Sequence, residues 1–471
     1  MSTPSEPRLA KGQIGLLEVL IPGLAQVAPA FNLFFTTGVM ASLAGASVPL
    51  IFLISMVGVL ATASSLAQFA GIYPSSGSFL TYIAKSIGAR TATSVGVIAI
   101  LGYIIAFGGI YIFVGSYIVS NVLGSPHIWG INEIVTIIYG ALVTAPVIVG
   151  LKFGVRVSYA LYIFEAVLLI VMSFAFLIHG GPQGISATPF HWPGGSKSTL
   201  LAFSLAILAF GGFEAAAPLA EETRDPRRNV PRAVLGTVIV SGLIYVLGSY
   251  ALVIAFGPSH AGALAADPNP FHTAASKYIS VLAPVVTWIF LTSVTSSYVA
   301  ANTQTSRVIY GGARSGLWAG ALAAISPKFQ TPYLAAIAFV APSIIIGVIS
   351  TAFTDPGTAS GFLGTYGILG VIVMYLVTNV ALIVHWAKDR TTDARKSLTR
   401  LVVPIIGIIV LAIPVYGDLQ PGQAAPYNSL PYLTVALIVV GVIYTAVLAV
   451  RRPGVIAEAP GLLEGAEFAD E

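Results

Sequence analysis

The sequence contains no cysteine and only 8% charged residues. The absence of cysteine excludes disulfides, thiolate nucleophiles, thiolate zinc sites and cysteine-ligated iron–sulfur clusters. A soluble globular chain carries about 25% charged residues, so this chain lacks the charge to cover a surface that faces water. Because 56% of its 471 residues are hydrophobic, it must be solvated mostly by lipid. We therefore expect an integral membrane protein.

Motifs for ATP and for metals are also missing. No G-x-x-x-x-G-K-[ST] sequence occurs, so the chain offers no phosphate-binding loop for ATP-driven transport. The six histidines are not spaced as metal ligands. The net charge of +4 is too small to indicate nucleic acid as a partner. We therefore expect no cofactor, no metal site and no nucleic-acid partner.

Long apolar runs dominate what is present. A transmembrane helix needs about 20 mostly apolar residues, whereas a barrel strand is an alternating segment of about ten. The runs here, such as 134–150 and 241–256, are apolar on every face and therefore predict helices. Twelve runs can be placed, at residues 14–44, 48–71, 93–122, 130–151, 157–178, 199–221, 232–256, 281–311, 333–352, 362–387, 400–416 and 430–450.

The positively charged residues indicate how these helices are oriented. Short cytoplasmic loops of membrane proteins collect Lys and Arg. With these spans, all but two of the 22 Lys and Arg residues fall on one side, the exceptions being Lys197 and Lys277. Both termini are therefore expected in the cytoplasm, with the spans in the lipid bilayer of the plasma membrane. Residues 1–13 are expected to form a short cytosolic tail, and residues 453–471 a disordered acidic one.

Two of the spans are not expected to be continuous helices. In the first, Pro29 stands in the middle of GLAQVAPAFNLFF (23–35). Proline removes an amide donor and clashes with the preceding turn, but it suits the first turn of a new helix. In the sixth, FSLAILAFGGFEAAAPLAEE (203–222) has Gly211 and Gly212 at its middle. Unwound backbone at that depth is tolerated only where it is buried in protein or lines a cavity.

Broken helices at corresponding positions of two halves indicate the central site of a transporter. The breaks fall in spans one and six, so residues 14–178 and 199–387 form two candidate repeats of five spans, and residues 400–450 add two more spans. Because each repeat has an odd number of spans, the second is inserted upside down relative to the first. The alternative is that these Pro and Gly residues only kink the helices.

Four motifs carry information about the family. The longest, AFGGFEAAAPLAEETRDPRRNVPRAV (209–234), spans the sixth run and the loop after it. The others are YPSSGSFLTYI (73–83), SRVIYGGARSG (306–316) and PKFQTPY (327–333). Together they resemble the amino acid–polyamine–organocation (APC) superfamily of transporters. The resemblance implies an all-α membrane protein with 12 transmembrane helices, arranged as a 5+5 inverted repeat of the leucine-transporter type plus two additional helices.

The resemblance also implies a substrate site at the two breaks. The segment that matches the family's carboxylate-binding backbone consists of Val27, Ala28, Pro29, Ala30 and Phe31. The family is more often glycine-rich there, and Pro29 leaves this chain with fewer amides. Span six is expected to offer backbone carbonyls to an ammonium group, with Phe210 or Phe213 as a movable aromatic gate. The residues of this second segment are Ala209, Phe210, Gly211, Gly212 and Phe213.

Two glutamates stand within apolar spans, where a carboxylate is costly unless it is paired or protonated. Glu214 follows the unwound glycines, and it either hydrogen-bonds the freed backbone and senses protonation or is purely structural. Glu165 lies well inside span five, at a position where some proton-dependent members of the family carry a lysine. We favour Glu165 as a group that loads and releases a proton. The alternatives are a structural partner or a cation ligand.

The remaining candidates are polar and aromatic side chains. Span eight is rich in Ser and Thr, among which Ser293 is a candidate substrate contact. Ser296 and Ser297 are candidate cation ligands, although small hydroxyl residues also join helices. The candidate aromatic contacts, which at helical spacing can equally be packing residues, are Tyr103, Phe107 and Tyr366.

These features predict a secondary active transporter that moves an amino acid or a related small amine across the plasma membrane by alternating access, coupled to protons. Sodium-coupled symport and exchange are the alternatives within this class. The small number of intramembrane carboxylates favours zwitterionic or mono-amine substrates over polyamines. A channel would need charged rings or a repeated filter sequence, and an enzyme would need clustered catalytic groups. Neither pattern is found in the sequence.

Overall fold

The computed structural model of the chain describes residues 9, 11–125, 130–194, 197–267, 269–388 and 394–462. Within these ranges the protein is helical and contains no strand, although Ile14 and Thr223 form an isolated parallel bridge. The longer helices are α1 (Leu16–Val27), α2 (Pro29–Ala44), α3 (Val48–Ile72), α5 (Ala89–Asn121), α6 (Ile131–Val149), α7 (Leu151–His179), α8 (Lys197–Leu208), α9 (Pro226–Phe256), α12 (Val286–Arg314), α13 (Tyr333–Ser350), α14 (Pro356–Lys388), α15 (Ala394–Asp418) and α16 (Leu430–Arg451).

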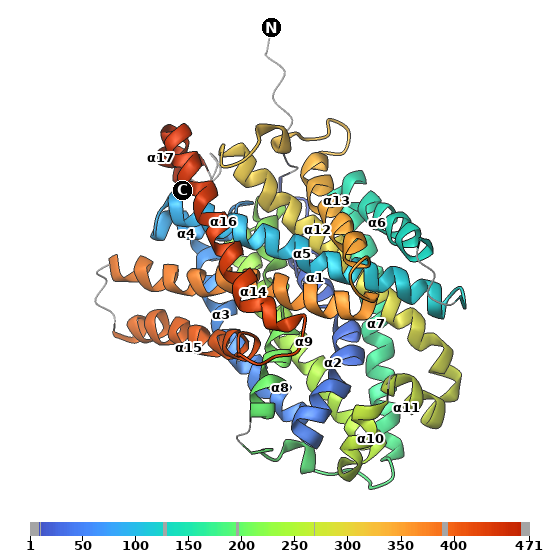
Figure 1. Ribbon diagram of the computed structural model, residues 1–471. Helices are drawn as coiled ribbons and strands as arrows, with labels where there is room; N and C mark the ends of the chain where they lie inside the picture. Colours follow the sequence, from blue (N-terminus) through green and yellow to red (C-terminus); the bar gives the residue numbers. More distant parts are fainter. Residues whose placement is uncertain are drawn as a thin grey trace.

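Shorter helical segments connect them. The short α-helices are α4 (Phe79–Ser86), α10 (Ala261–Ala266), α11 (Pro270–Tyr278) and α17 (Pro453–Leu462). The 3-10 segments are η1 (Gly45–Ser47), η2 (Thr188–Phe190), η3 (Phe213–Glu222), η4 (Pro258–His260), η5 (Ser280–Val285), η6 (Gly320–Ala323) and η7 (Tyr427–Ser429). In Figure 1, α10 and α11 lie at the lower end of the bundle and α17 lies at the upper end.

Eleven helical stretches in the described ranges are long and apolar enough to cross a membrane. The first of them, Leu16–Ile72, has 57 residues and contains α1, α2 and α3, which is far more than one span requires. Large apolar side chains such as Val57 and Leu142 are exposed on the outside of the bundle. In a protein of this composition, that apolar surface is the one that lipid covers.

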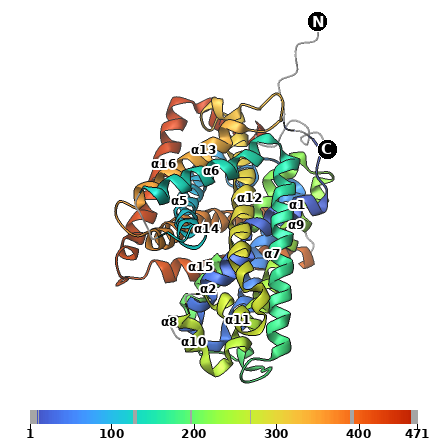
Figure 2. The ribbon, with the colours of Figure 1, turned by 90° about the vertical axis from the view of Figure 1, so that its right-hand side faces the viewer.

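Glycines allow the central helices to approach closely. Helix α5 packs along α14, and α3 packs along α9. A Cβ atom on Gly102 of α5 would lie only 2.6 Å from the carbonyl oxygen of Gly367 in α14, so this crossing requires glycine. Figure 2 shows α7 and α12 side by side, and these two helices also pack against each other.

One side of the molecule gathers the start of α1, the end of η3, the end of α12 and the end of α16, and we call it the terminal side. Before α1, the amides of Gln13 and Ile14 donate to the carbonyl oxygen of Glu222 over 2.7 and 3.2 Å. Arg307 forms an ion pair with the same Glu222, with 2.8 Å between Nε and Oε2. Arg307 belongs to the cations of the expected cytoplasmic side, and its side chain is fully buried in α12.

The end of the chain differs from expectation. The sequence predicts disorder after Pro453, but Pro453–Leu462 forms α17, which packs against α4, α5 and α16. Ala459 of this helix is fully buried, and Glu458 is the one charged residue of this mostly apolar segment, which explains why it packs as a helix. The rest of the predicted acidic tail, residues 463–471, lies outside the described residues, as do residues 1–8 and 10 of the predicted N-terminal tail.

Candidate substrate site at two broken helices

The first break lies between α1 and α2, as the sequence predicts. Helix α1 ends at Val27, and Ala28 takes a left-handed conformation with φ of 47°. The Ala28 N–H donates to the carbonyl oxygen of Ala25 over 3.1 Å, which closes the last turn. Pro29 then occupies the first position of α2, where its missing N–H costs nothing. The first turn of α2 therefore has few free amides: Phe31 N–H already donates to the Ser293 hydroxyl over 3.1 Å.

The second break follows α8, again at the predicted glycines. Helix α8 ends at Leu208, and two turn bonds follow, from Phe210 N–H to Ile207 and from Gly211 N–H to Leu208. Gly212 has φ of +106°, a conformation that side chains rarely adopt. The chain then continues as the 3-10 segment η3, so one apolar stretch is divided into an α-helix and a 3-10 segment.

Two side chains that no sequence motif indicates tie the breaks together. Asn32 Nδ2 donates to the carbonyl oxygen of Val27 over 2.7 Å and lies 3.4 Å from that of Ala209. The Tyr245 hydroxyl, from α9, bridges the same two oxygens at 3.2 and 2.6 Å. The carbonyl groups released by unwinding are therefore satisfied across the breaks. This arrangement holds α1 and η3 next to each other.

Glu214 lies directly beyond the second break, and its carboxylate is surrounded by donors. Tyr103 of α5 donates to Oε1, and Tyr375 of α14 donates to Oε2 over 2.5 Å. Gln304 of α12 lies 3.5 Å from Oε1. The Tyr375 hydroxyl also accepts from the Gly212 N–H over 3.4 Å, so this tyrosine joins the carboxylate to the unwound backbone. Glu214 thus connects η3 with three other helices.

The predicted aromatic gate residues are both buried beside these groups. The Phe213 ring stacks on that of Tyr375, with centroids 5.0 Å apart, and Phe210 packs edge-on against Tyr245 at 5.2 Å. Phe107 is also buried, and its ring packs edge-on against Tyr298 at 5.5 Å. These rings form the apolar surroundings of the breaks.

Tyr366 does not lie with the other predicted residues. Its hydroxyl donates to the carbonyl oxygen of Leu433 over 3.1 Å, which places it against α16. Tyr375 is nine residues further along α14, and at 100° per residue nine residues turn a helix by half a revolution. The face of α14 that points to Glu214 is therefore the face opposite Tyr366. A polar stripe of Tyr375, Thr378 and Asn379 in an otherwise apolar span was the signal that could have identified this face.

The serines of α12 have different roles. Ser293 accepts from Phe31, as described, and Ser297 donates to the carbonyl oxygen of Gln26 in α1 over 2.9 Å. The Ser296 hydroxyl instead donates to the Ser293 carbonyl of its own helix. Two of the three hydroxyls therefore contact the segment around the first break. No cluster of three His, Asp or Glu side chains suited to a metal ion occurs in the ranges that the structure describes.

Glu165 of α7 is the second glutamate within the spans, and it is fully buried. Neither of its carboxyl oxygens makes a hydrogen bond within the described part of the chain. The Ser293 hydroxyl lies beside the carboxyl, and Tyr245 interacts with it electrostatically. The carboxyl of Glu165 is therefore one hydroxyl away from the first turn of α2. Glu214, in contrast, has every donor it needs.

A comparison with protein families agrees with this architecture. A family model described as "Amino acid permease" matches residues 18–452, which include both breaks and every candidate residue described above. The chain belongs to the amino acid permease family. It is accordingly a multi-pass membrane protein of a transporter family.

Individual relatives are similar in sequence to most of this permease at low identity. The low-affinity putrescine importer PlaP of Escherichia coli K12 is 27% identical, over 80% of this chain and 84% of the importer. The branched-chain amino acid permease BcaP of Bacillus subtilis is 23% identical, over 93% and 94% of the two chains. The methylthioribose transporter of Bacillus subtilis is 23% identical, over 81% and 82%.

The two tyrosines of α14 give a matched test of the Glu214 cluster in this permease. Tyr375→Phe removes a hydroxyl that donates to a buried carboxylate, a bond worth about 1.5–3 kcal/mol, so we expect uptake to fall about tenfold to hundredfold. Tyr366→Phe removes a hydroxyl bonded to Leu433 and should leave uptake within about twofold. Initial uptake rates at equal membrane content measure both. Equal losses of uptake in the two variants would show that uptake has no special need for the hydrogen bond from Tyr375 to Glu214.

Proposed function

We propose that the chain is a secondary active transporter that carries an amino acid or a small amine across the plasma membrane by alternating access. The observation that supports this most is the pair of broken helices whose freed carbonyls are tied together by Asn32 and Tyr245. Broken helices present partial positive charge at one half-helix start and carbonyls at the other, which suits a charged substrate at the middle of the membrane.

The proposed architecture has twelve crossings in two inverted repeats, residues 14–178 and 199–387, followed by residues 400–450. The stretch Leu16–Ile72 is long enough for two crossings, one made by α1 with α2 and one by α3. With this count, the breaks occupy the first and the sixth crossing. From the distribution of Lys and Arg we infer that the terminal side faces the cytoplasm, and we expect both termini there.

The substrate would lie between the two breaks, among residues 27–31, 209–213 and Ser293. Of the first amides of α2, Pro29 has no N–H and that of Phe31 is taken by Ser293, so Ala30 N–H is the remaining donor to a carboxylate. On the other side, the Ala209 carbonyl already accepts from Tyr245. The carbonyls of Phe210 and Gly211 are thus the better candidates for an ammonium group.

This imbalance favours recognition of the amine end over the carboxylate end. One remaining amide is a weak anchor for a carboxylate, whereas the buried carboxyl of Glu165 makes no hydrogen bond within the described part of the chain. A diamine is therefore a second candidate substrate, and the relative PlaP is a putrescine importer. The scarcity of further carboxylates at membrane depth still favours an amino acid or a mono-amine over longer polyamines.

We assign coupling to protons at Glu165. A buried carboxylate without a hydrogen bond is costly in a membrane, whereas the neutral acid is not. Because Ser293 stands between Glu165 and the Phe31 amide, a change in the charge of Glu165 reorients a hydroxyl that holds the first turn of α2. Protonation of Glu165 would in this way change the position of the first turn of α2 at the substrate site. Ser296 and Ser297 remain the candidate ligands in the alternative of sodium coupling.

Glu165→Gln should separate coupling from translocation. The amide resembles the protonated acid in shape and cannot release a proton, so we expect accumulation driven by a pH gradient to be lost while exchange of internal for external substrate continues. Glu165→Asp keeps a titratable group and should retain part of the accumulation. The measurement is uptake into proteoliposomes with and without an imposed pH gradient. Unchanged accumulation in Glu165→Gln would return Glu165 to a structural role.

The substrate is tested by a panel in the same proteoliposomes. The panel includes leucine, asparagine, putrescine and methylthioribose, each with a pH gradient, a sodium gradient and no gradient. We expect an amino acid or an amine to accumulate with the pH gradient alone. A requirement for sodium without any response to pH would reject proton coupling. If no compound accumulates or exchanges under any gradient, the transporter proposal fails.

A further inference from the structure

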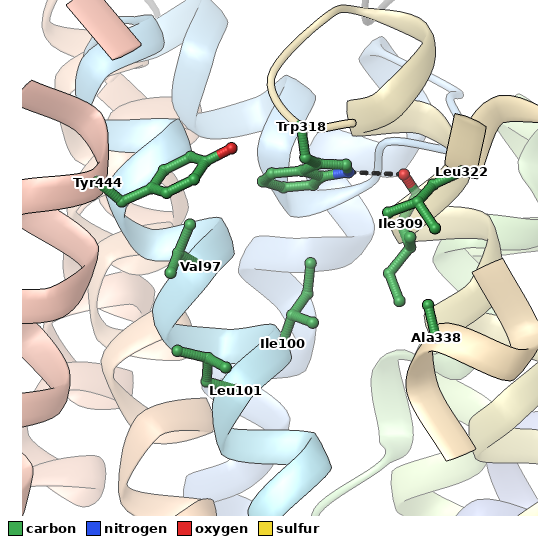
Figure 3. A pocket seen from close by; sticks show the side chains of 8 residues that line it. All are labelled: Val97, Ile100, Leu101, Ile309, Trp318, Leu322, Ala338 and Tyr444. Carbon is green, nitrogen blue, oxygen red and sulfur yellow. Dashed lines mark hydrogen bonds between the residues drawn. The ribbon is translucent and has the colours of Figure 1, made fainter. Parts of the chain in front are cut away.

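An apolar groove lies on the outer surface of the helix bundle, between α5, α12, α13 and α16 (Figure 3). Its volume is about 200 Å³. None of the residues that line it belongs to α1, α2, α8 or η3, so it is separate from the candidate substrate site. Val97, Ile100 and Leu101 of α5 form one wall, Ala338 of α13 lies opposite, and Trp318 and Tyr444 close one end.

The two polar side chains of the groove use their polar atoms within the protein. The Tyr444 hydroxyl donates to the carbonyl oxygen of Leu317 over 2.8 Å. The Trp318 Nε1–H donates to that of Ile309 over 2.7 Å, the bond drawn in Figure 3. The surface that remains is hydrocarbon, which does not attract water. An apolar cavity of about 150 Å³ already binds a benzene-sized ligand, so this groove has room for part of an acyl chain.

Positive charge lies at one end of the groove, on both of its helical walls. Arg90 precedes Val97 by seven residues on α5, and Arg451 follows Tyr444 by seven residues on α16. Seven residues make almost two full helical turns, so each arginine lies on the same face of its helix as the groove residue, about 10 Å further along. The two helices run in opposite directions, and both arginines therefore lie toward the terminal side. Both side chains are exposed.

We propose that this groove binds an anionic phospholipid, with one acyl chain between α5, α13 and α16 and the phosphate group between Arg90 and Arg451. The chemistry of the two parts matches: a hydrocarbon surface at membrane depth leads to a pair of cations at the level of the headgroups. Anionic lipids are enriched in the cytoplasmic leaflet, and this is the leaflet that the proposed orientation gives to the terminal side. The lipid site does not depend on which substrate the permease carries.

The binding of defined lipids to the full-length protein tests the charged part of the site. The chain is purified in detergent, stripped of lipid and titrated with phosphatidylglycerol or phosphatidylcholine of the same acyl chains, with native mass spectrometry as the readout. We expect one saturable phosphatidylglycerol site and weaker phosphatidylcholine binding. Each arginine replaced by glutamine should weaken phosphatidylglycerol binding about fivefold, and R90Q with R451Q about 25-fold. Inorganic phosphate alone should not compete, because it lacks the acyl chain.

A matched double variant controls for the loss of two charges. Lys152 and Arg156 are exposed on α7, which forms no part of the groove. K152Q with R156Q removes the same charge from the proposed cytoplasmic side and should bind phosphatidylglycerol as the wild type does. An equal loss in this control would show that binding reflects general attraction to a basic protein, and it would overturn the site.

Filling the groove tests the apolar part. Ala338→Phe places a ring in the space for the acyl chain and should reduce phosphatidylglycerol binding at least tenfold, whereas the adjacent Ile337→Phe, at a position 44% exposed outside the groove, should not. If Ala338→Phe does not fold, the lipid binding of the R90Q and R451Q variants still tests the proposal. Equal binding of the two lipids overturns the proposal. So does a stable dimer that buries this face, because the groove would then hold a second copy of the chain.

Discussion

Gly212→Ala is expected to abolish uptake, whereas Gly211→Ala should retain most of it. Gly212 has φ of +106°, and a Cβ atom there would lie 2.6 Å from Gln26 Cγ and 3.2 Å from the backbone carbon of Gln26. The last turn of α1 packs directly on this glycine. Alanine would therefore strain the turn, at a cost of about 1–3 kcal/mol, and also push α1 away from η3.

The position of Gln26 leaves little room for adjustment. Its carbonyl oxygen accepts from Ser297 over 2.9 Å, which fixes the end of α1 against α12. If α1 moved, the carbonyls of Val27 and Ala209 would no longer both reach Asn32 and Tyr245. A single methyl group at Gly212 thus disturbs the two breaks together. We expect the protein to remain in the membrane with a lower melting temperature and with no measurable accumulation of substrate.

Gly211 is the matched control, because it is the neighbouring glycine of the same break but has different atoms around it. A Cβ atom on Gly211 would lie 3.1 Å from Ile368 Cδ1, the flexible end of a side chain, and 3.2 Å from the carbonyl oxygen of Leu208. The required shifts are a few tenths of an ångström, so a loss of about twofold to fivefold in uptake is expected. Uptake at equal membrane content measures transport by the two glycine variants, and thermal unfolding of the purified proteins measures their stability. Full uptake by Gly212→Ala would mean that α1 and η3 do not need this contact.

The breaks themselves were accessible from the sequence for a local reason. Proline and paired glycine act on the backbone within one or two residues, and the structure has α2 starting at Pro29 and α8 ending just before Ala209. The left-handed residue Ala28 was included in the predicted segment. Its conformation could not be read from its identity, because alanine has no special preference for it.

The side chains that organise the breaks were harder to predict. The membrane spans are apolar all round, so periodicity does not show which face of a helix points inward. The sequence predicts a contact at Tyr366 of α14, whereas Tyr375 is the residue of this helix that faces Glu214. Asn32 and Tyr245 come from the other wall of the site, and only packing brings them to the carbonyls of Val27 and Ala209. Polar residues inside apolar runs are the feature of the sequence that indicates which face of a span points inward.

Loop charges illustrate a related difficulty. Counting Lys and Arg yields an orientation, but it does not show whether each cation is exposed or buried. Arg307 is fully buried in the pair with Glu222, while Arg314 and Glu221 form a partly exposed pair. Sequence neighbours therefore have very different environments, which only the packing of α12 against η3 decides.

These two ion pairs make the last comparison, in which Glu222→Gln is expected to destabilise the protein far more than Glu221→Gln. The side chains of Arg307 and Glu222 are 0% and 1% exposed, so removing one charge leaves the other buried and uncompensated, at a cost of about 3–5 kcal/mol. Arg314 and Glu221 are 31% and 15% exposed, and solvent screening limits their loss to about 1 kcal/mol. The melting temperatures of the two purified variants, measured without ligand in the same detergent, show which variant is less stable.

A paired apolar replacement then separates stability from transport. Glu222→Leu with Arg307→Met removes both buried charges, and such replacements are often neutral or stabilising, so stability should return close to that of the wild type. We expect uptake to stay low, because alternating access must open the terminal side to water. Water can solvate two separated ions there, whereas an apolar contact would keep that side closed. Recovery of uptake together with stability would instead show that the pair of Arg307 and Glu222 serves only to hold α12 against η3.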